Sequence, residues 1–188
     1  MLACVLLLQS PSALPGPGFD PDLPQVESRI RKGVLSLRGT FQVHSSGHHV
    51  WEVLTDYPHI PDFIKSIRRS ALIERHQDSV VVEQEATAHA LFLTETLHLR
   101  LVIHQHAPDS LVFQDTRHSD FELYQGEWRV AYVGETARVS YLLRAKPRTL
   151  VPATIAKTVL QKSAVELLTQ VRSEIIRRTL SHASASVQ

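Results

Sequence analysis

Near the end of the chain, the stretch of residues 151–180 reads VPATIAKTVLQKSAVELLTQVRSEIIRRTL. A proline stands near its start, where the first turn of a helix tolerates it, and no further proline or glycine follows. Its apolar residues recur at steps of three and four, which gathers them on one face of a helix. This face contains Ala156, Leu160, Ala164, Leu167, Val171 and Ile175. The stretch therefore predicts a long amphipathic helix over roughly residues 152–180, with one face buried against another element.

Upstream of this helix, apolar and polar residues alternate with the period of a half-buried strand. The first such strand begins near Gly33 and carries Leu35, Leu37, Phe41 and Val43 on one face. Six more strands follow, and their short turn-like connections imply antiparallel pairing. They are predicted at residues 68–75, 79–88, 91–106, 110–116, 121–132 and 137–146.

An interruption between the first and second strands reads SSGHHVWEVLTDYPHIPDFIKSI, residues 45–67. Ser45 or Ser46 can cap a short helix, and Pro58 and Pro61 separate it from a second short helical piece around residues 60–64. The sequence therefore predicts an α+β fold in which a curved antiparallel sheet of about seven strands grips the long C-terminal helix.

One domain is expected over residues 33–180, with a flexible tail at 181–188. Residues 1–32 are predicted to be an apolar leader and a proline-rich linker, in which residues 25–32 form a short helical turn or an extended lead-in. The leader, residues 1–8, resembles the hydrophobic part of a secretory signal but lacks the basic residues that precede one. A misassigned start codon or a frayed apolar tail explains this apolar segment nearly as well as a secretory signal does. We predict a cytoplasmic protein, with export or peripheral membrane attachment as the alternatives.

The composition is that of a soluble globular protein, with 43% hydrophobic and 21% charged residues in a chain of 188. The formal net charge of +1 gives no support to nucleic-acid binding. A single cysteine, Cys4, excludes an intrachain disulfide. The oligomeric state stays open.

Two groups of motifs resemble the START-like helix-grip (SRPBCC) superfamily, in particular its polyketide cyclase/dehydrase and coenzyme-Q-binding branch. The first group is VWEVLTDY, residues 50–57, followed by IPDFI, residues 60–64. The second is GEWRV, residues 126–130, with GETARVSY, residues 134–141, and then AKP at 145–147 and VP at 151–152. The resemblance covers about residues 33–180 and implies the same helix-grip fold. Members of this superfamily bind lipids, quinones, polyketides or plant hormones, and a minority are enzymes, so the resemblance implies function only by analogy.

Strand parity independently predicts which side chains face the helix. Alternate residues of the last three long strands form an apolar wall with aromatic groups that carry a polar tip, which suits a ligand pocket as well as it suits a filled core. Trp51 and Tyr57 are expected to be packing and turn residues of the short helices. The predicted ligand-binding residues are Gln84, Leu97, Leu99, Phe113, Tyr124, Trp128, Tyr141, Leu160, Ala164, Leu167 and Val171.

Catalytic and metal-binding patterns are weak. His98, His104 and His106 share one strand face, but that face is predicted to point outward, as is the face of Glu83 and Glu85. The pair His48–His49 has no matching acidic partner in the sequence pattern, and Cys4 has no assigned base. We therefore predict no catalytic residue, no metal and no cofactor.

The predicted function is to bind a lipid, an isoprenoid quinone or a polycyclic aromatic between the sheet and the helix. One alternative is a cyclase or dehydratase that uses Tyr124 or Tyr141 as an acid, because the predicted wall offers no carboxylate or histidine. The other is a protein-docking assembly factor with a collapsed cavity. Leu91 and Phe92, at a strand junction, and residues 148–151 could touch a bilayer during loading or could be ordinary core edges.

Overall fold

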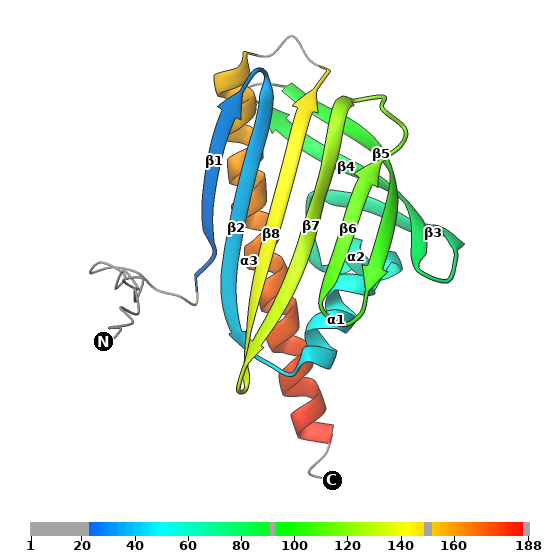
Figure 1. Ribbon diagram of the computed structural model, residues 1–188, viewed down its shortest axis with the longest axis vertical. Coiled ribbons are helices and arrows are strands. Elements are labelled where there is room, and N and C mark those ends of the chain that lie inside the picture. The colour runs from blue at the N-terminus through cyan, green and yellow to red at the C-terminus, as the bar shows by residue number, and fades with distance from the viewer. Residues whose placement is uncertain (1–22, 91–92, 149–151, 186–188) are drawn as a thin grey trace, which may run out of the picture.

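The computed structural model describes residues 23–90, 93–148 and 152–185 of the chain (Figure 1). The expectations about the leader at residues 1–8, Cys4, Leu91, Phe92 and residues 149–151 lie outside these described residues. Among the described residues, no helix is both long enough and apolar enough to cross a membrane.

A single sheet of eight antiparallel strands forms the body of the described chain (Figure 1). Its spatial order is β1-β2-β8-β7-β6-β5-β4-β3, so the long connection from β2 to β3 joins the two halves of the sheet. The strands are β1 Gln25–Arg31, β2 Val34–His44, β3 Ile67–Arg75, β4 Ser79–Ala90, β5 Leu93–His106, β6 Ser110–Asp115, β7 Phe121–Val133 and β8 Thr136–Pro147.

The connection from β2 to β3 contains α1 Gly47–Thr55, the 3₁₀ turn η1 Tyr57–His59 and α2 Ile60–Phe63. Ser46 caps α1, since its side chain accepts a hydrogen bond from the backbone N–H of His49. The long helix α3, Ala153–Ala185, lies across the inner face of the sheet and contacts β1, β2, β4, α1 and α2 (Figure 1). The predicted α+β helix-grip architecture is therefore confirmed, including the two short helices.

The strand count is eight rather than about seven because residues 25–31 form β1. Lys32 and Gly33 both have positive φ, 51° and 76°, as a tight hairpin turn between β1 and β2 requires. Charged residues on the outer face of β1 weaken its apolar alternation, and only Val26 packs on the core. That is why the sequence pattern left a helical turn or an extended lead-in open.

The buried face of α3 is wider than the predicted stripe. Ala164, Val171 and Ile175 are buried as expected, but so is Leu168, which the stripe omitted and which is 0% exposed. A Cβ built on Gly39 of β2 would lie 2.3 Å from Leu168 Cδ1, so the helix approaches β2 most closely where the strand has no side chain. Helix α3 thus buries one flank against β1 and β2 and turns the other toward the interior.

Candidate ligand cavity

Two cavities lie between the inner face of the sheet and α3. The first, of about 130 Å³, is bounded by the short helices and the middle of α3. The second, of about 120 Å³, lies nearer the start of α3 and is bounded by β4 and β5. Below, the cavity beside the short helices is called the lower cavity, and the one nearer the start of α3 is called the upper cavity.

The two cavities are adjacent and share part of their lining. Five residues line both of them, one from each of β3, β4, β7, β8 and α3. These partition residues are Ile67, Gln84, Tyr124, Tyr141 and Leu167. These five residues therefore form the boundary between the two spaces.

Every residue predicted to bind ligand lines at least one cavity. Those of the lower cavity include Phe113, Trp128 and Val171, and those of the upper cavity include Leu97, Leu99, Leu160 and Ala164. The remaining four, Gln84, Tyr124, Tyr141 and Leu167, belong to the partition. The structure therefore brings all eleven together, and their role in binding stays a prediction.

The sequence pattern missed the contribution of the β2–β3 connection. This connection lines the lower cavity through Val53, Leu54, Tyr57, Ile60, Phe63 and Ile64. Tyr57 was expected only to pack and turn, but it also faces the cavity, and its hydroxyl accepts a hydrogen bond of 2.8 Å from Gln105 Nε2. The apolar spacing of α1 indicated a buried face, but that spacing does not identify what the face packs against.

Aromatic rings fill the region between the cavities and β6. Trp128 and Tyr141 have ring centroids 4.5 Å apart, and Phe121 and Tyr124 are 4.8 Å apart. Phe113 stacks near-parallel to Tyr141 at 6.1 Å. Such pairs add stabilisation beyond the area they bury.

The hydroxyl groups of Tyr124 and Tyr141 lie close enough inside this aromatic cluster to affect each other's pKa. Burial raises the pKa of Tyr124 above its ordinary value, despite the opposing effect of Tyr141. Burial also raises the pKa of Tyr141, well above its ordinary value, and Tyr124 adds to the effect. Both phenols therefore stay protonated near neutral pH, which suits hydrogen bonding to a ligand better than proton transfer.

No charged side chain of the described residues lines either cavity. One carboxylate was nevertheless missed on the inner side of β6: Asp115 is 0% exposed. Its two oxygens accept hydrogen bonds of 3.0–3.1 Å from the backbone N–H groups of Arg100, Arg117 and His118. Asp115 thus holds a turn and does not line the cavities.

The outer face of the sheet carries the residues that were predicted to be solvated. His104 and His106 are exposed and His98 is half-buried. Glu83 pairs with Arg100 at 3.1 Å and Glu85 with Arg69 at 3.7 Å. A hollow of about 440 Å³ over β5–β8 also lies on this face. It is larger than either interior cavity, but polar and charged groups such as Glu127 and Arg144 share its walls, so it suits an apolar ligand poorly.

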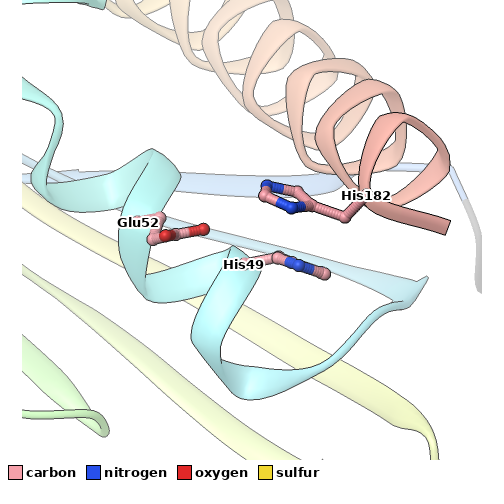
Figure 2. Close-up of side chains that lie close together, drawn as sticks. All are labelled: His49, Glu52 and His182. Atoms are coloured by element: carbon pink, nitrogen blue, oxygen red, sulfur yellow. The ribbon is translucent and has the colours of Figure 1, made fainter. Parts of the chain in front are cut away.

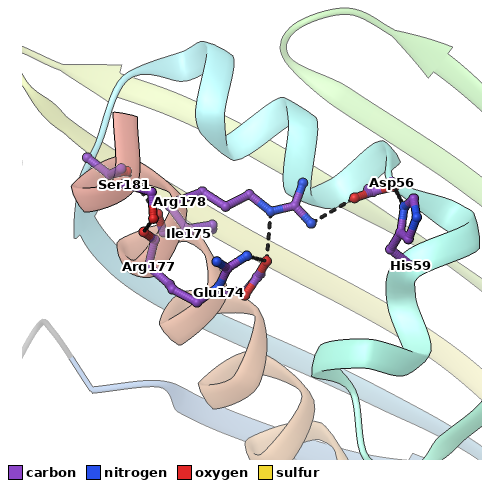
Figure 3. A network of polar contacts seen from close by, with 8 residues as sticks. Asp56, His59, Glu174, Ile175, Arg177, Arg178 and Ser181 are labelled. Carbon is purple, nitrogen blue, oxygen red and sulfur yellow. Dashed lines mark hydrogen bonds and ion pairs between the residues drawn. The ribbon is translucent and has the colours of Figure 1, made fainter. Parts of the chain in front are cut away.

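An ion-pair network fastens the end of α1 to α3 (Figure 3). Arg178 donates to Asp56 Oδ2 and to Glu174 Oε1, both at 2.7 Å. Glu174 is 7% exposed and also accepts two hydrogen bonds from Arg177. On the other side of Asp56, His59 Nδ1 lies 2.6 Å from Oδ1. The network therefore holds the cavity-lining short helices against the long helix.

This network changes the protonation of its members. Burial raises the pKa of Asp56, but the hydrogen bonds from His59 and Arg178 outweigh it and leave the pKa below its ordinary value. The hydrogen bond to Asp56 raises the pKa of His59 above its ordinary value. Asp56 thus adds stability that is lost as pH falls through its lowered pKa. His59 adds stability that is complete below its ordinary pKa of about 6.5 and is lost as pH rises through the raised value.

We expect the replacement Asp56→Asn to return the pKa of His59 to its ordinary range, since the carboxylate is the main cause of the shift. A proton NMR titration of the imidazole measures this directly. Asp62→Asn is the matched control because Asp62 is only a minor contributor to the same shift, so it should leave most of the shift in place. Equal effects of the two replacements would contradict the assigned pairing.

Comparisons with known proteins agree with this architecture. Residues 43–172 match the model of the family described as polyketide cyclase / dehydrase and lipid transport. No curated protein matches the chain by sequence.

Several solved structures share the fold. The STAR-related lipid transfer protein of Xanthomonas axonopodis has 14% identity and a TM-score of 0.71 over 84% of this chain and 96% of its own. The Zhui aromatase/cyclase of Streptomyces sp. R1128 has 17% identity and a TM-score of 0.67 over 77% and 95%. Human STARD10 has 10% identity and a TM-score of 0.64 over 84% and 78%. At these identities the likeness shows the fold alone.

Proposed function

Because the chain belongs to the polyketide cyclase/dehydrase and lipid transport family, we propose that it binds an apolar small molecule between the sheet and α3. The proposal rests mainly on the two adjacent cavities, which share five lining residues and have no charged lining residue among the described ones. A lipid, an isoprenoid quinone or a polycyclic aromatic has the matching chemistry. Removing such a ligand's surface from water contributes about 25 cal/mol per Å² of apolar area.

Each cavity is smaller than the roughly 300–1,000 Å³ of typical small-molecule sites. A ligand of useful size therefore has to move the partition residues and occupy both spaces. Gln84 is suited to follow such a movement, because its amide makes only a 3.3 Å hydrogen bond to Ser70 on the neighbouring strand. The Tyr124 and Tyr141 hydroxyls and the Gln84 amide are the groups proposed to orient a polar head group.

Entry is proposed to pass the short helices, since they form one wall of the lower cavity and are fastened to α3 by side chains at their ends. The Asp56–Arg178 ion pair is the contact that such an opening has to break. Transient membrane contact during loading is part of this proposal. One fold relative is described as a lipid transfer protein, which favours a lipid among the candidate ligands.

The second candidate function is a cyclase or dehydratase, favoured by the similarity in fold to an aromatase/cyclase and by the paired phenols. The raised pKa values of both tyrosines count against it, because a strong proton donor needs a pKa near the working pH. A Tyr124→Phe variant separates the two functions: turnover by the wild type that is lost in a variant with retained binding supports an enzyme, and no turnover of polyketides or aromatics by either protein supports a carrier. Uptake of no ligand, together with a stable protein partner, supports the docking alternative.

Binding of a pyrene-labelled fatty acid, followed by fluorescence, tests the location of the site. Ala164 is 4% exposed and lines the upper cavity, so Ala164→Phe fills the space and should weaken binding about tenfold or more. Val165→Phe is the matched control, because Val165 lies next along α3 and is 39% exposed. We expect this control to bind like the wild type.

Equal affinity of the two folded variants would place the probe elsewhere, for example in the outer hollow, and would contradict the proposal. Circular dichroism and the unfolding temperature of each variant establish that both retain the fold.

A further inference from the structure

A separate cluster of side chains joins the first turns of α1 to the last turn of α3 (Figure 2). His49 and Glu52 stand one helical turn apart on α1, and His182 faces them from α3. One ligand atom from each of the three lies within 4.8 Å of the others. We propose that His49, Glu52 and His182 form a binding site for a zinc-type divalent transition-metal ion.

The donor set selects the class of metal. Two imidazoles and one carboxylate are a set that Zn²⁺ uses where a fourth position is left to water or another ligand. Imidazole nitrogen favours Zn²⁺, Cu²⁺ and Ni²⁺, whereas Mg²⁺ and Ca²⁺ prefer sites made of oxygen ligands. The cluster is therefore assigned to a transition metal rather than to a hard alkaline-earth ion.

The distances require only local adjustment. Zinc bonds of about 2.0–2.2 Å place tetrahedral ligand atoms roughly 3.3–3.5 Å apart, so the present 4.8 Å spread has to shrink by about 1.5 Å at most. The His49 and His182 rings stack with centroids 4.7 Å apart and an angle of 19° between their planes, so one ring has to rotate out of the stack before both can bind one ion. His49 and Glu52 are half-buried and His182 is exposed, so side-chain rotations can supply this movement.

Neighbouring groups prepare two of the ligands. Ser46 Oγ lies 3.2 Å from His49 Nδ1, where it can accept the Nδ1 proton and leave the Nε2 lone pair for a metal. His48 Nε2 lies 3.1 Å from Glu52 Oε1, which orients the carboxylate and leaves its other oxygen available. The sequence pattern predicted no acidic partner for His48–His49. This prediction is wrong, because Glu52 pairs with His48.

Space for a fourth ligand exists beside the cluster. An open hollow of about 340 Å³ is lined by Glu52, Thr55, Asp56, Arg178 and His182. A metal here would clamp α1 to α3 alongside the Asp56–Arg178 ion pair, and α1 carries Val53 and Leu54 to the lower cavity. The site nevertheless does not depend on what the cavity binds.

Isothermal titration of the full chain with ZnCl₂ tests the proposal. We expect one ion per chain, and we expect His49→Ala and His182→Ala each to weaken binding by about 100-fold. His104→Ala is the matched control, because it removes an exposed imidazole from the outer face of the sheet. It should bind zinc like the wild type.

A second measurement tests whether the metal ion holds α1 against α3. ZnCl₂ should raise the unfolding temperature of the wild type but not of His182→Ala, and MgCl₂ should raise neither. The proposal is overturned if His182→Ala keeps wild-type zinc affinity, if His104→Ala is the variant that loses it, or if Mg²⁺ binds as well as Zn²⁺. His182 is exposed and His49 is half-buried. Equal unfolding temperatures of the metal-free proteins establish that both variants fold.

Discussion

Leu168→Ala should lower the free energy of unfolding by about 2–5 kcal/mol, the range measured for leucine truncation in closed cores. Leu168 is 0% exposed and packs where α3 approaches Gly39 of β2. The neighbouring backbone of β2 is held by pairing with both β1 and β8, so it cannot collapse into the space that the leucine leaves. Urea unfolding followed by circular dichroism measures the change.

Leu180→Ala is the control on the same helix, because Leu180 is 63% exposed. It should change the unfolding free energy by less than about 0.5 kcal/mol. Similar losses of unfolding free energy for the two variants would contradict the packing of α3 on β2 through Leu168.

The second large effect is expected from Gly126→Ala in the middle of β7. A Cβ at this position would lie 2.1 Å from the backbone oxygen of Leu142 and 2.4 Å from Phe113 Cζ. The phenylalanine ring can rotate, but the carbonyl is fixed by the pairing of β7 with β8. We expect a loss of about 3 kcal/mol, at the upper end of the cost of overpacking.

Gly134→Ala is the comparison for this variant. Its φ is +60°, and no atom lies within 4 Å of a built Cβ, so only backbone strain of about 1 kcal/mol is expected. Adding Phe113→Leu to Gly126→Ala should recover only a minor part of the loss, because the nearer clash is with the backbone. Full recovery would show that the ring, and not the Leu142 carbonyl, sets the requirement for glycine.

Much of the fold follows from local periodicity. The 152–180 stripe and the alternation in the long strands predicted α3, β2 and β4–β8 because each of these elements buries one regular face. The sequence pattern did not identify β1 as a strand, because Val26 and Ile30 stand among charged residues. The strand forms mainly through its pairing with β2. The burial of Leu168 was not predicted, because a helix that packs on two sides buries more than one stripe of apolar residues.

The candidate sites, too, were predicted only in part from the sequence. Parity placed Tyr124, Trp128 and Tyr141 on the inner face, where they line the cavities. It could not place α1 over the lower cavity, since periodicity identifies a buried face but not its partner. The cluster of His49, Glu52 and His182 could not be predicted from the sequence pattern, because it forms only where the end of α3 lies beside the start of α1. Contacts between such distant segments come from the packing of whole elements.

Mass spectrometry of an organic extract from the gently purified wild-type protein shows whether the cavities between the sheet and α3 carry a ligand. We expect one lipid, quinone or polycyclic aromatic molecule per chain, which the pyrene-labelled fatty acid displaces. Val165→Phe should behave in the same way, whereas Ala164→Phe, whose cavity is filled, should bind both molecules weakly. An extract without any such molecule, from a protein that also fails to bind the probe, would contradict a carrier function for the cavities between the sheet and α3.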